Sequence, residues 1–575
     1  MTSQDAASTA SDERTFPWLK NYPAHVDWHE AIPPAPLFHL LDRAAREHPN
    51  AICTNFQGRT LTYGQILKLS DSVAAGLQDL GLSKGDRVGL LLPNTPTFVV
   101  YYYAILKAGG VVVNFNPLYT LEELAGQVRD SGTKLMVTLD LKVLFDKAEA
   151  LIADGVLDRA VVAPFCRLLP GTKAALFRLL RARQLARPLA SKVSDRLILE
   201  ADLMVDGAEP DPVQVDPVRD LAVLQYTGGT TGSPKGAMLT HYNCYVNALH
   251  VARWSPPVPV GEERVMGVLP FFHVFAMTVV MNYAVARAAT MIIMPRFVLE
   301  DAMRLIQHLR PTYMPAVPTL FNAILGHPRL ASFDLSSIKF CISGGAALPL
   351  EVKKRFEDLT GSHIVEGYGL SEASPVVTCN VMGATSRDGS IGVPFPQTIV
   401  SLRDLSDPER EVPIGEKGEL CVKGPQVMQG YWKKPEETAT VFTLDGFLRT
   451  GDVARMAADG SLTIEDRIKD LIICSGYNVY PRRIEEAIYT HPAVAEVTVI
   501  GLKDPYRGEA PKAFVKLKSG MTLDPGELMK HLELKLSRIE LPAEIEFRDE
   551  LPKTMIGKLS KKELKAEEAR RGQKT

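Results

Sequence analysis

The stretch 226–241 constrains this chain more than any other feature, and it reads YTGGTTGSPKGAMLTH. It follows an apolar run at 221–226 and precedes a polar stretch that could open a helix. Glycines let backbone N–H groups approach phosphate oxygens, threonine hydroxyls donate to those oxygens, and a lysine adds positive charge. The stretch therefore predicts a polyphosphate-binding loop, with these binding residues: Thr227, Gly228, Gly229, Thr230, Thr231 and Lys235.

The two commonest nucleotide loops do not fit this string. A Walker A loop needs Gly before its Lys and Ser or Thr after it, whereas Lys235 stands between Pro234 and Gly236. The spacing of its glycines also departs from the G-x-G-x-x-G of dinucleotide-binding folds. Composition alone fits an ordinary surface loop equally well. The full string resembles the phosphate loop of the adenylate-forming superfamily, which comprises acyl-CoA synthetases, luciferases and peptide-synthetase adenylation domains.

Composition narrows the class of protein. The 575 residues suffice for two or more domains, and a net charge of −2 gives no electrostatic case for nucleic acid. Seven scattered cysteines without a C-x-x-C pair predict a reducing compartment with neither disulfides nor a zinc site. The polar N-terminus lacks the apolar core of a secretory signal, and the apolar runs 98–106 and 274–286 are too short to cross a bilayer. We expect a cytoplasmic protein without a transmembrane helix.

The order of apolar segments indicates a layered α/β fold. Helical patterns at 37–47 and 63–80 alternate with strand-like runs at 87–92 and 111–114. After about residue 465 a charged connector, 466–470, leads into shorter elements of an α+β unit that ends in a lysine-rich tail. We predict a flexible N-terminal tail (1–30), a large multi-subdomain adenylate-forming domain (31–468) and a small mobile α+β domain (469–575).

The segment 167–192 is unusually basic. No acidic residue occurs between Arg159 and Asp195, and leucines are interleaved with the arginines. One interpretation is a solvated helix with buried leucines. The other is a basic helix that rests on an anionic membrane, which would make the protein peripheral on the inner face of the membrane.

Two further glycine-containing strings match the superfamily in the same order. In the family, the aromatic of E-G-Y-G-L-S-E stacks on adenine and its last Glu holds the Mg²⁺ of ATP, so the resemblance assigns these roles to Tyr368 and Glu372. The S-G-G-A string at 343–346 follows a strand-like run and resembles the segment that lines the adenine and acyl pockets. The residues that these strings add to the nucleotide site are Gly344, Gly345, Glu366, Gly367, Tyr368, Gly369 and Ser371.

Two strings nearer the C-terminus complete the resemblance. In the family, the Asp of T-G-D accepts hydrogen bonds from the ribose hydroxyls and a following Arg assists, which implies Asp452 and Arg467 here. The P-K-T-x-x-G-K string at 552–558 implies that Lys558 is the catalytic lysine of adenylation. Such a lysine lowers the repulsion between an attacking carboxylate and the triphosphate.

The positions of these residues in two domains imply that the domains move. Lys558 belongs to the small domain, whereas the phosphate loop belongs to the large one. We therefore expect domain alternation about a hinge at Lys469, with a pantetheine channel for CoA opening beside Gly476.

The string P-F-F-H-V-F at 270–275 resembles the acyl-site motif of the family, and it places His273 at the substrate carboxylate. No Asp or Glu occurs from Val274 to Leu299, which argues against an amino acid substrate, because an unpaired buried ammonium is costly. Apolar residues suit a methylene chain, each buried CH₂ of which contributes about 0.8 kcal/mol. We predict an acyl site of His273, Met277, Val317 and Gly344.

Together these strings resemble a fatty acid–CoA ligase of the bacterial long-chain type. The resemblance implies the reaction fatty acid + ATP + CoA = acyl-CoA + AMP + PPi, with Lys558, Thr227, Glu372 and His273 as catalytic residues. It also implies Mg²⁺ on Glu372 and Thr227, and a monomer or homodimer. Three alternatives stay open: an aryl-acid ligase of the 4-coumarate type, a ligase that loads a carrier protein, and a catalytically silent sensor.

Overall fold

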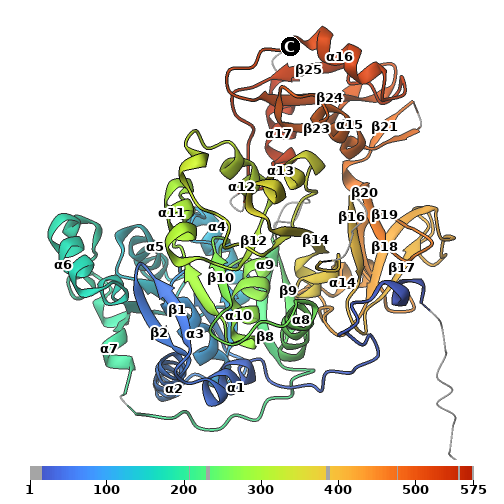
Figure 1. Cartoon of the computed structure of the whole chain (residues 1–575). Helices are drawn as coiled ribbons and strands as arrows, with labels where there is room; N and C mark the ends of the chain where they lie inside the picture. The colour runs from blue at the N-terminus through green and yellow to red at the C-terminus, as the bar shows by residue number, and fades with distance from the viewer. Residues whose placement is uncertain are drawn as a thin grey trace, which may run out of the picture.

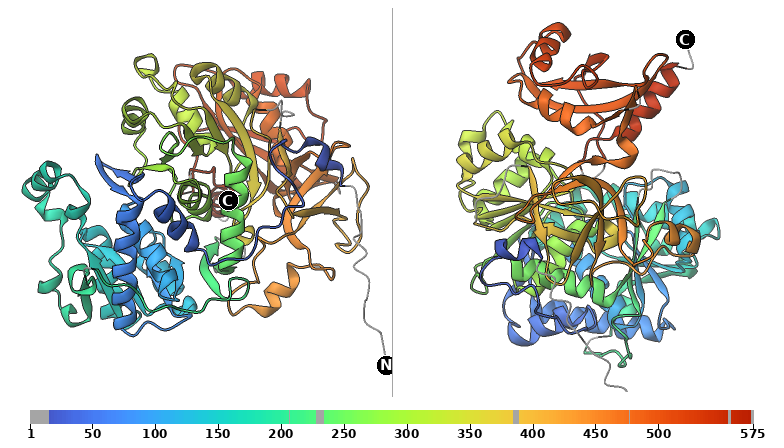
Figure 2. Two further views of the ribbon diagram at one scale, coloured as in Figure 1. Left: turned by 60° about the horizontal axis from the view of Figure 1, so that its bottom comes forward. Right: turned by 90° about the vertical axis from the view of Figure 1, so that its right-hand side faces the viewer.

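The computed structural model describes residues 16–205, 207–227, 234–383, 389–475, 477–554 and 557–572. A large α/β domain contains two sheets, and a smaller α+β domain with its own sheet stands over one end of it (Figure 1; Figure 2, right). This arrangement confirms the predicted fold class. The mobility of the small domain stays a prediction.

The first sheet of the large domain has seven strands in the order β7-β6-β5-β3-β4-β8-β9, parallel except for β9. The predicted strand at 111–114 is β4, and the predicted strand at 87–92 ends at Leu90. The last pair, β8 and β9, forms the hairpin that carries the phosphate-loop string. The bounds are β3 Arg87–Leu90, β4 Val111–Asn114, β5 Leu135–Leu139, β6 Arg159–Ala163, β7 Leu197–Leu199, β8 Leu221–Thr227 and β9 Lys235–Thr240.

The second sheet has thirteen strands in the order β17-β18-β19-β20-β16-β15-β14-β13-β12-β10-β11-β1-β2. Strands β1, β11, β10, β12, β13 and β14 are parallel, and β15 to β20 continue the sheet in antiparallel pairs. Parallel strands bring their carboxyl ends to one edge, which gathers the loops after β13 and β14. The bounds are β1 Ile52–Phe56, β2 Arg59–Thr62, β10 Arg264–Gly267, β11 Thr290–Ile293, β12 Tyr313–Ala316, β13 Phe340–Ser343, β14 His363–Gly369, β15 Val376–Cys379, β16 Ser390–Pro394, β17 Ile399–Arg403, β18 Lys417–Lys423, β19 Leu448–Met456 and β20 Leu462–Arg467.

Helices of the large domain begin where the sequence offers a cap. The hydroxyl of Thr62 accepts from the backbone N–H of Gln65, whose side chain accepts in return, so the predicted helix at 63–80 begins at Tyr63. The helix predicted at 37–47 begins two residues later. The bounds are α1 His39–Glu47, α2 Tyr63–Asp79, α3 Pro96–Lys107, α4 Leu121–Ser131, α5 Lys142–Ala153, α6 Gly171–Leu180, α7 Glu200–Leu203, α8 His241–Trp254, α9 Val274–Ala276, α10 Tyr283–Ala286, α11 Leu299–Leu309, α12 Pro318–Leu325, α13 Leu350–Thr360 and α14 Pro435–Thr440.

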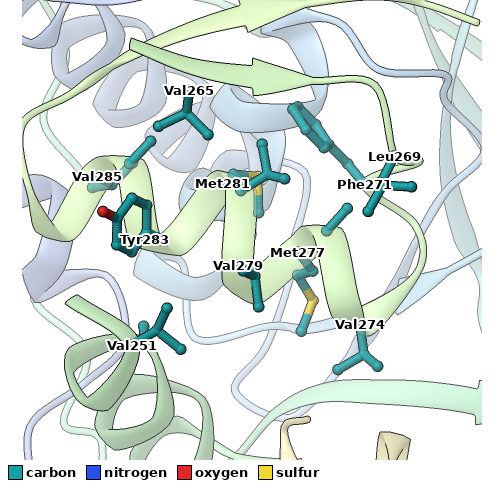
Figure 3. Close-up of a cluster of buried hydrophobic side chains, with 14 of the residues drawn as sticks. Val251, Val265, Leu269, Phe271, Val274, Met277, Val279, Met281, Tyr283 and Val285 are labelled. Carbon is teal, nitrogen blue, oxygen red and sulfur yellow. The ribbon is translucent and has the colours of Figure 1, made fainter. Parts of the chain in front are cut away.

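The apolar run at 274–286 is a core helix. It comprises α9, a wider turn at Met277–Asn282, and α10, and its side chains are buried around the whole circumference. Figure 3 shows Met277, Val279 and Met281 packed among side chains from α8 and β10. Among the described residues, no helix is long and apolar enough to cross a membrane. All seven cysteines are buried free thiols.

The small domain has a separate sheet of five strands and a separate core. Its strands lie side by side in the order β22-β21-β24-β23. Strand β21 pairs with the beginning of β24, at Gly508, and β25 pairs with residues 512–515 of β24. Side chains such as Ile484, Val497 and Val515 fill the core between this sheet and its helices. The bounds are β21 Ile472–Cys474, β22 Tyr477–Val479, β23 Val494–Asp504, β24 Gly508–Leu517, β25 Glu544–Phe547, α15 Pro481–Tyr489, α16 Pro525–Glu533 and α17 Lys561–Gly572.

The segment 16–30 differs from the flexible tail predicted for residues 1–30. The Trp18 side chain is 2% exposed and stacks on Phe16, and its backbone lies against Gly460. Asn21 donates from its side-chain amide to the carbonyl of Asp459. The aromatic side chains are buried against the large domain, so this segment is part of the fold, and residues 1–15 lie outside the described residues.

Candidate active site

A cleft of about 2440 Å³ lies between the two domains. Its walls include Thr227, Gly345 and Glu372 of the large domain and Lys558 and Lys561 of the small domain. Ligand sites usually measure about 300–1,000 Å³, so this cleft has room for several substrates. Most residues predicted from the sequence line it, although the motifs are far apart along the chain.

The β8–β9 hairpin brings Thr227 and Lys235 into register, and both line the cleft. The predicted residues Gly228, Gly229, Thr230 and Thr231 lie outside the described residues. The hairpin therefore holds the two ends of the loop at one wall of the cleft.

Two residues that the sequence analysis missed surround Lys235. Its ammonium lies 2.5 Å from a carboxylate oxygen of Glu437 on α14 and 5.2 Å from the centre of the Tyr431 ring. The Tyr431 hydroxyl donates to Glu372 at 2.8 Å. Burial and the negative charge of Glu372 raise the pKa of Tyr431, so the phenol keeps the proton that it donates. Tyr431 thus connects the two groups predicted to handle phosphate and Mg²⁺.

The predicted ribose site forms a compact group of three side chains. The Tyr368 hydroxyl donates to one oxygen of Asp452 at 2.6 Å, and Arg467 lies 3.1 Å from the other oxygen. The Asp452 carboxylate is therefore fixed by partners on both sides, and it faces the cleft. Buried Glu419, also missed in the sequence, accepts from Arg449 and from the backbone of Gly451, which secures the turn before Asp452.

The loop after β14 also lines the cleft. Gly367, Gly369 and Ser371 all contribute to the wall. Glu366 is buried, and its carboxylate accepts from the backbone N–H of Leu348 at 3.1 Å. In this arrangement Glu366 supports the loop that follows β13.

The small domain inserts Lys558 into the cleft. Gly557 accepts a hydrogen bond from the Thr319 hydroxyl of α12 at 2.6 Å, which fixes the turn against the large domain. The side chain of Lys558 lies against Gly345, where an added Cβ would stand 2.3 Å from Cε and 2.8 Å from Nζ. Burial and the charge of Arg467 lower the pKa of Lys558 to about 8. Only glycine at 345, with φ of +81°, leaves this space for the lysine.

His273 lies at the start of the core helix and lines the cleft. Its Nδ1 accepts from the backbone N–H of Phe275, which assigns the ring proton to Nε2. Burial and the charge of Lys558 lower the pKa of His273 to about 3, so the ring is neutral. Gly344 lies against the ring of Phe275, where a Cβ would approach within 2.9 Å.

The structure separates the predicted acyl residues into two groups. His273 and Gly344 line the cleft together with Phe275. Met277 and Val317 are buried in the core and do not belong to the cleft wall formed by the described residues. Their contact with an acyl chain stays a prediction that requires a path beyond this cleft.

The predicted hinge residue Lys469 lies in a short turn, Ile468–Asp470, between the large-domain strand β20 and the small-domain strand β21. Polar contacts span this turn. The backbone N–H of Arg482 donates to Asp466, its guanidinium donates to the carbonyl of Ile464, and Lys565 pairs with Asp470. Gly476, predicted beside a CoA channel, lies outside the described residues.

Carboxylates line the cleft, but its described residues do not form a complete metal site. Among the described residues, no three His, Cys, Asp or Glu side chains gather closely enough to hold a metal ion. Glu372 and Thr227 nevertheless offer oxygen atoms at the wall, as Mg²⁺ prefers. They suit an ion that takes most of its ligands from a phosphate substrate and water.

Comparison with known proteins covers both domains. The family described as AMP-binding enzyme matches residues 41–432, and the AMP-binding enzyme C-terminal domain matches residues 483–558. A long-chain-fatty-acid–CoA ligase of Bacillus subtilis (strain 168) is 44% identical over 553 residues, which cover 96% of this chain and 98% of that protein. One of Yersinia pestis is 38% identical, with the same coverage. The crystal structure of ATP-bound MatB from Rhodopseudomonas palustris has a TM-score of 0.77 at 29% identity, over 93% of this chain and 99% of that one.

Proposed function

Because this chain belongs to the AMP-binding enzyme family, we propose that it is an ATP-dependent fatty acid–CoA ligase of the long-chain type. It joins an acid to the α-phosphate of ATP and then transfers the acyl group to CoA. The observation that carries the proposal is the position of Lys558 against Gly345, in a cleft that also contains Asp452, Arg467 and the ends of the phosphate loop.

In the first step the carboxylate of the acid attacks the α-phosphorus of ATP, and pyrophosphate leaves. Two anions must approach each other, so cations at the reacting centre lower the barrier. Lys558 is the cation for the carboxylate and the α-phosphate, and Lys235 is the cation for the leaving pyrophosphate. Asp452 accepts from the ribose hydroxyls while Tyr368 and Arg467 hold its carboxylate in place.

Neutral His273 borders the acyl carboxylate. A neutral ring with its proton on Nε2 can donate a hydrogen bond without adding charge, and it leaves Lys558 as the cation at this point. Mg²⁺, held by Glu372 and Thr227 together with ATP oxygens, would neutralise phosphate charge.

In the second step the thiol of CoA attacks the acyl carbon, and AMP leaves. Lys558 occupies part of the cleft in the present arrangement, so a rotation of the small domain about Lys469 is proposed to withdraw it. The pantetheine arm then enters beside Gly476. The turn that contains Lys469 supports this assignment because it is the short connection between the last strand of one domain and the first strand of the other.

The proposed substrate is a fatty acid. Apolar side chains in the cleft wall support an alkyl chain: Val251, Phe272, Phe275, Ile342, Val376 and Phe395. The stretch from Val274 to Leu299 contains no Asp or Glu, so it supplies no partner for the ammonium of an amino acid. The long-chain acid in the names of the B. subtilis and Y. pestis relatives points the same way.

A panel of acids tests the proposal. The protein is incubated with ATP, Mg²⁺, CoA and one acid at a time, and AMP and acyl-CoA are measured. Octanoate to palmitate should give both products, with little turnover of coumarate. Preference for coumarate would make it an aryl-acid ligase, AMP without thioester would favour a carrier-protein acceptor, and no AMP from any acid would contradict an enzymatic function.

A further inference from the structure

Helix α6 turns its leucines away from the protein. Leu176, Leu179 and Leu180 are 55%, 79% and 67% exposed, and their i, i+3, i+4 spacing puts them on one side of the helix. The opposite side buries Ala174 and packs Phe177 against Phe165, with ring centres 5.1 Å apart. The interpretation of this segment as a solvated helix with buried leucines is therefore wrong for these three residues.

The turns after α6 add positive charge and one more leucine. Leu189 is 80% exposed. Four basic side chains, Arg181, Arg183, Arg187 and Lys192, are exposed and have no ion pair with any described residue. We call these four, together with Leu176, Leu179, Leu180 and Leu189, the α6 surface.

The other three basic residues of the segment have partners within the protein, so they do not belong to this surface; Lys173 donates to the carbonyl of Gln57 at 2.7 Å. Arg178 interacts with Asp140, and Arg167 interacts with Glu200. Glu149, on α5, accepts a hydrogen bond from Ser191. The four charges of the α6 surface have no such partner among the described residues.

The position of α6 leaves it accessible. Figure 1 shows α6 at the outer end of the large domain, while the small domain stands at the other end of the molecule. Along the chain α6 lies between β6 and β7, the two strands at one edge of the seven-stranded sheet. Figure 2 (left) shows the same separation. A partner on α6 would therefore not obstruct the small domain.

We propose that the α6 surface docks this protein on an anionic lipid bilayer. Exposed leucines enter the boundary between headgroups and acyl chains, and the surrounding arginines and lysine pair with lipid phosphates. A protein partner fits less well, because the α6 surface contains no aromatic side chain or methionine, the residue types that are enriched with arginine at protein interfaces. The proposal does not depend on the reaction, although a bilayer would be a source of the proposed substrate.

The charges and the leucines make separable contributions to binding. One basic residue near an anionic surface contributes roughly a fivefold factor in affinity, so removal of four should weaken binding by about a hundredfold or more. Salt should weaken it similarly, because these charges are exposed. Each leucine inserted into the bilayer should contribute a roughly tenfold factor in affinity.

Flotation of the purified full chain with vesicles tests the proposal. The vesicles contain either phosphatidylcholine alone or equal parts of phosphatidylcholine and phosphatidylglycerol. Two variants remove the two contributions separately: Arg181→Gln with Arg183→Gln, Arg187→Gln and Lys192→Gln, and Leu176→Ser with Leu179→Ser and Leu180→Ser. A matched control removes four exposed charges elsewhere: Arg46→Gln, Lys68→Gln, Lys530→Gln and Lys535→Gln.

The wild type and the control should float with anionic vesicles, and both α6 variants should stay in the soluble fraction. All four proteins should turn over a short, soluble acid equally without vesicles, which shows that they are folded. The proposal is wrong if the wild type does not bind anionic vesicles, or if the control loses as much binding as the α6 variants. It is also wrong if the leucine variant only converts a dimer into a monomer in light scattering, because the α6 surface would then be a protein interface.

Discussion

The contact between Lys558 and Gly345 gives a sharp prediction for Gly345→Ala. The added Cβ would stand 2.3 Å from Cε of Lys558, well inside contact distance, so the lysine has to leave its position. The φ of +81° adds a strain of about 1–2 kcal/mol for any residue with a Cβ. Loss of one preorganised donor at a reacting centre costs about 10²–10³ in rate, or about 2.7–4 kcal/mol. We expect Gly345→Ala to slow adenylation by that factor.

Gly361→Ala is the matched control. Gly361 also has a left-handed backbone, with φ of +69°, but an added Cβ there meets no atom within 4 Å. Both variants should therefore lose similar stability in thermal unfolding, while only Gly345→Ala should lose adenylation, measured as ATP–pyrophosphate exchange.

A double variant with Lys558→Ala sharpens the test, because the two changes remove the same interaction. Gly345→Ala should add no more than about a threefold further loss once the lysine is gone. This reasoning would be refuted by a wild-type rate of adenylation in Gly345→Ala. It would also be refuted if the loss of rate in the double variant equalled the product of the losses in the two single variants.

Three further predictions concern ATP, pH and the hinge. Glu437→Gln frees Lys235 from an ion pair of 2.5 Å, so KM for ATP should fall up to about fivefold with kcat unchanged, since such pairs contribute about 0.2–1 kcal/mol. Glu436→Gln removes the same charge one residue away and should leave KM for ATP unchanged. A rise in KM for Glu437→Gln would contradict the idea that Glu437 competes with ATP for Lys235. The pKa of Lys558 is lowered to about 8, and adenylation needs its charged form, so kcat/KM for ATP should fall as pH rises through about 8. The same descending limb in Lys558→Arg would assign it to another group. Lys469→Pro should retain adenylation and lose thioester formation, measured on supplied acyl-adenylate, and a full rate there would rule out this hinge.

Much of the proposed nucleotide site could be predicted from local strings. Gly344 follows β13 and Tyr368 belongs to β14, two parallel strands whose ends face the same cleft, and Asp452 lines this cleft from within β19, so the fold brings together what the motifs specify one by one. The chemistry of each string is local, and the mixed sheet supplies the convergence: its parallel strands bring in Gly344 and Tyr368, and its antiparallel part brings in Asp452.

Contacts that depend on the packing of distant segments could not be predicted. Tyr431 reaches Glu372 because its segment lies along β9, where Ala237 and Tyr431 form a bridge, and no spacing in the sequence encodes that pairing. The close approach of Lys558 to Gly345 depends on the orientation of two domains. The packing of Trp18 did leave a signal, because aromatic residues are unusual in a free tail.

The central claim is that Lys558 acts in adenylation and not in thioester formation. The direct test measures both half-reactions of Lys558→Ala: formation of acyl-adenylate from acid and ATP, and formation of acyl-CoA from supplied acyl-adenylate. We predict that the first falls by about a hundredfold or more while the second stays near the wild-type rate. An unchanged rate of the first half-reaction, or an equal loss in both, would contradict the account.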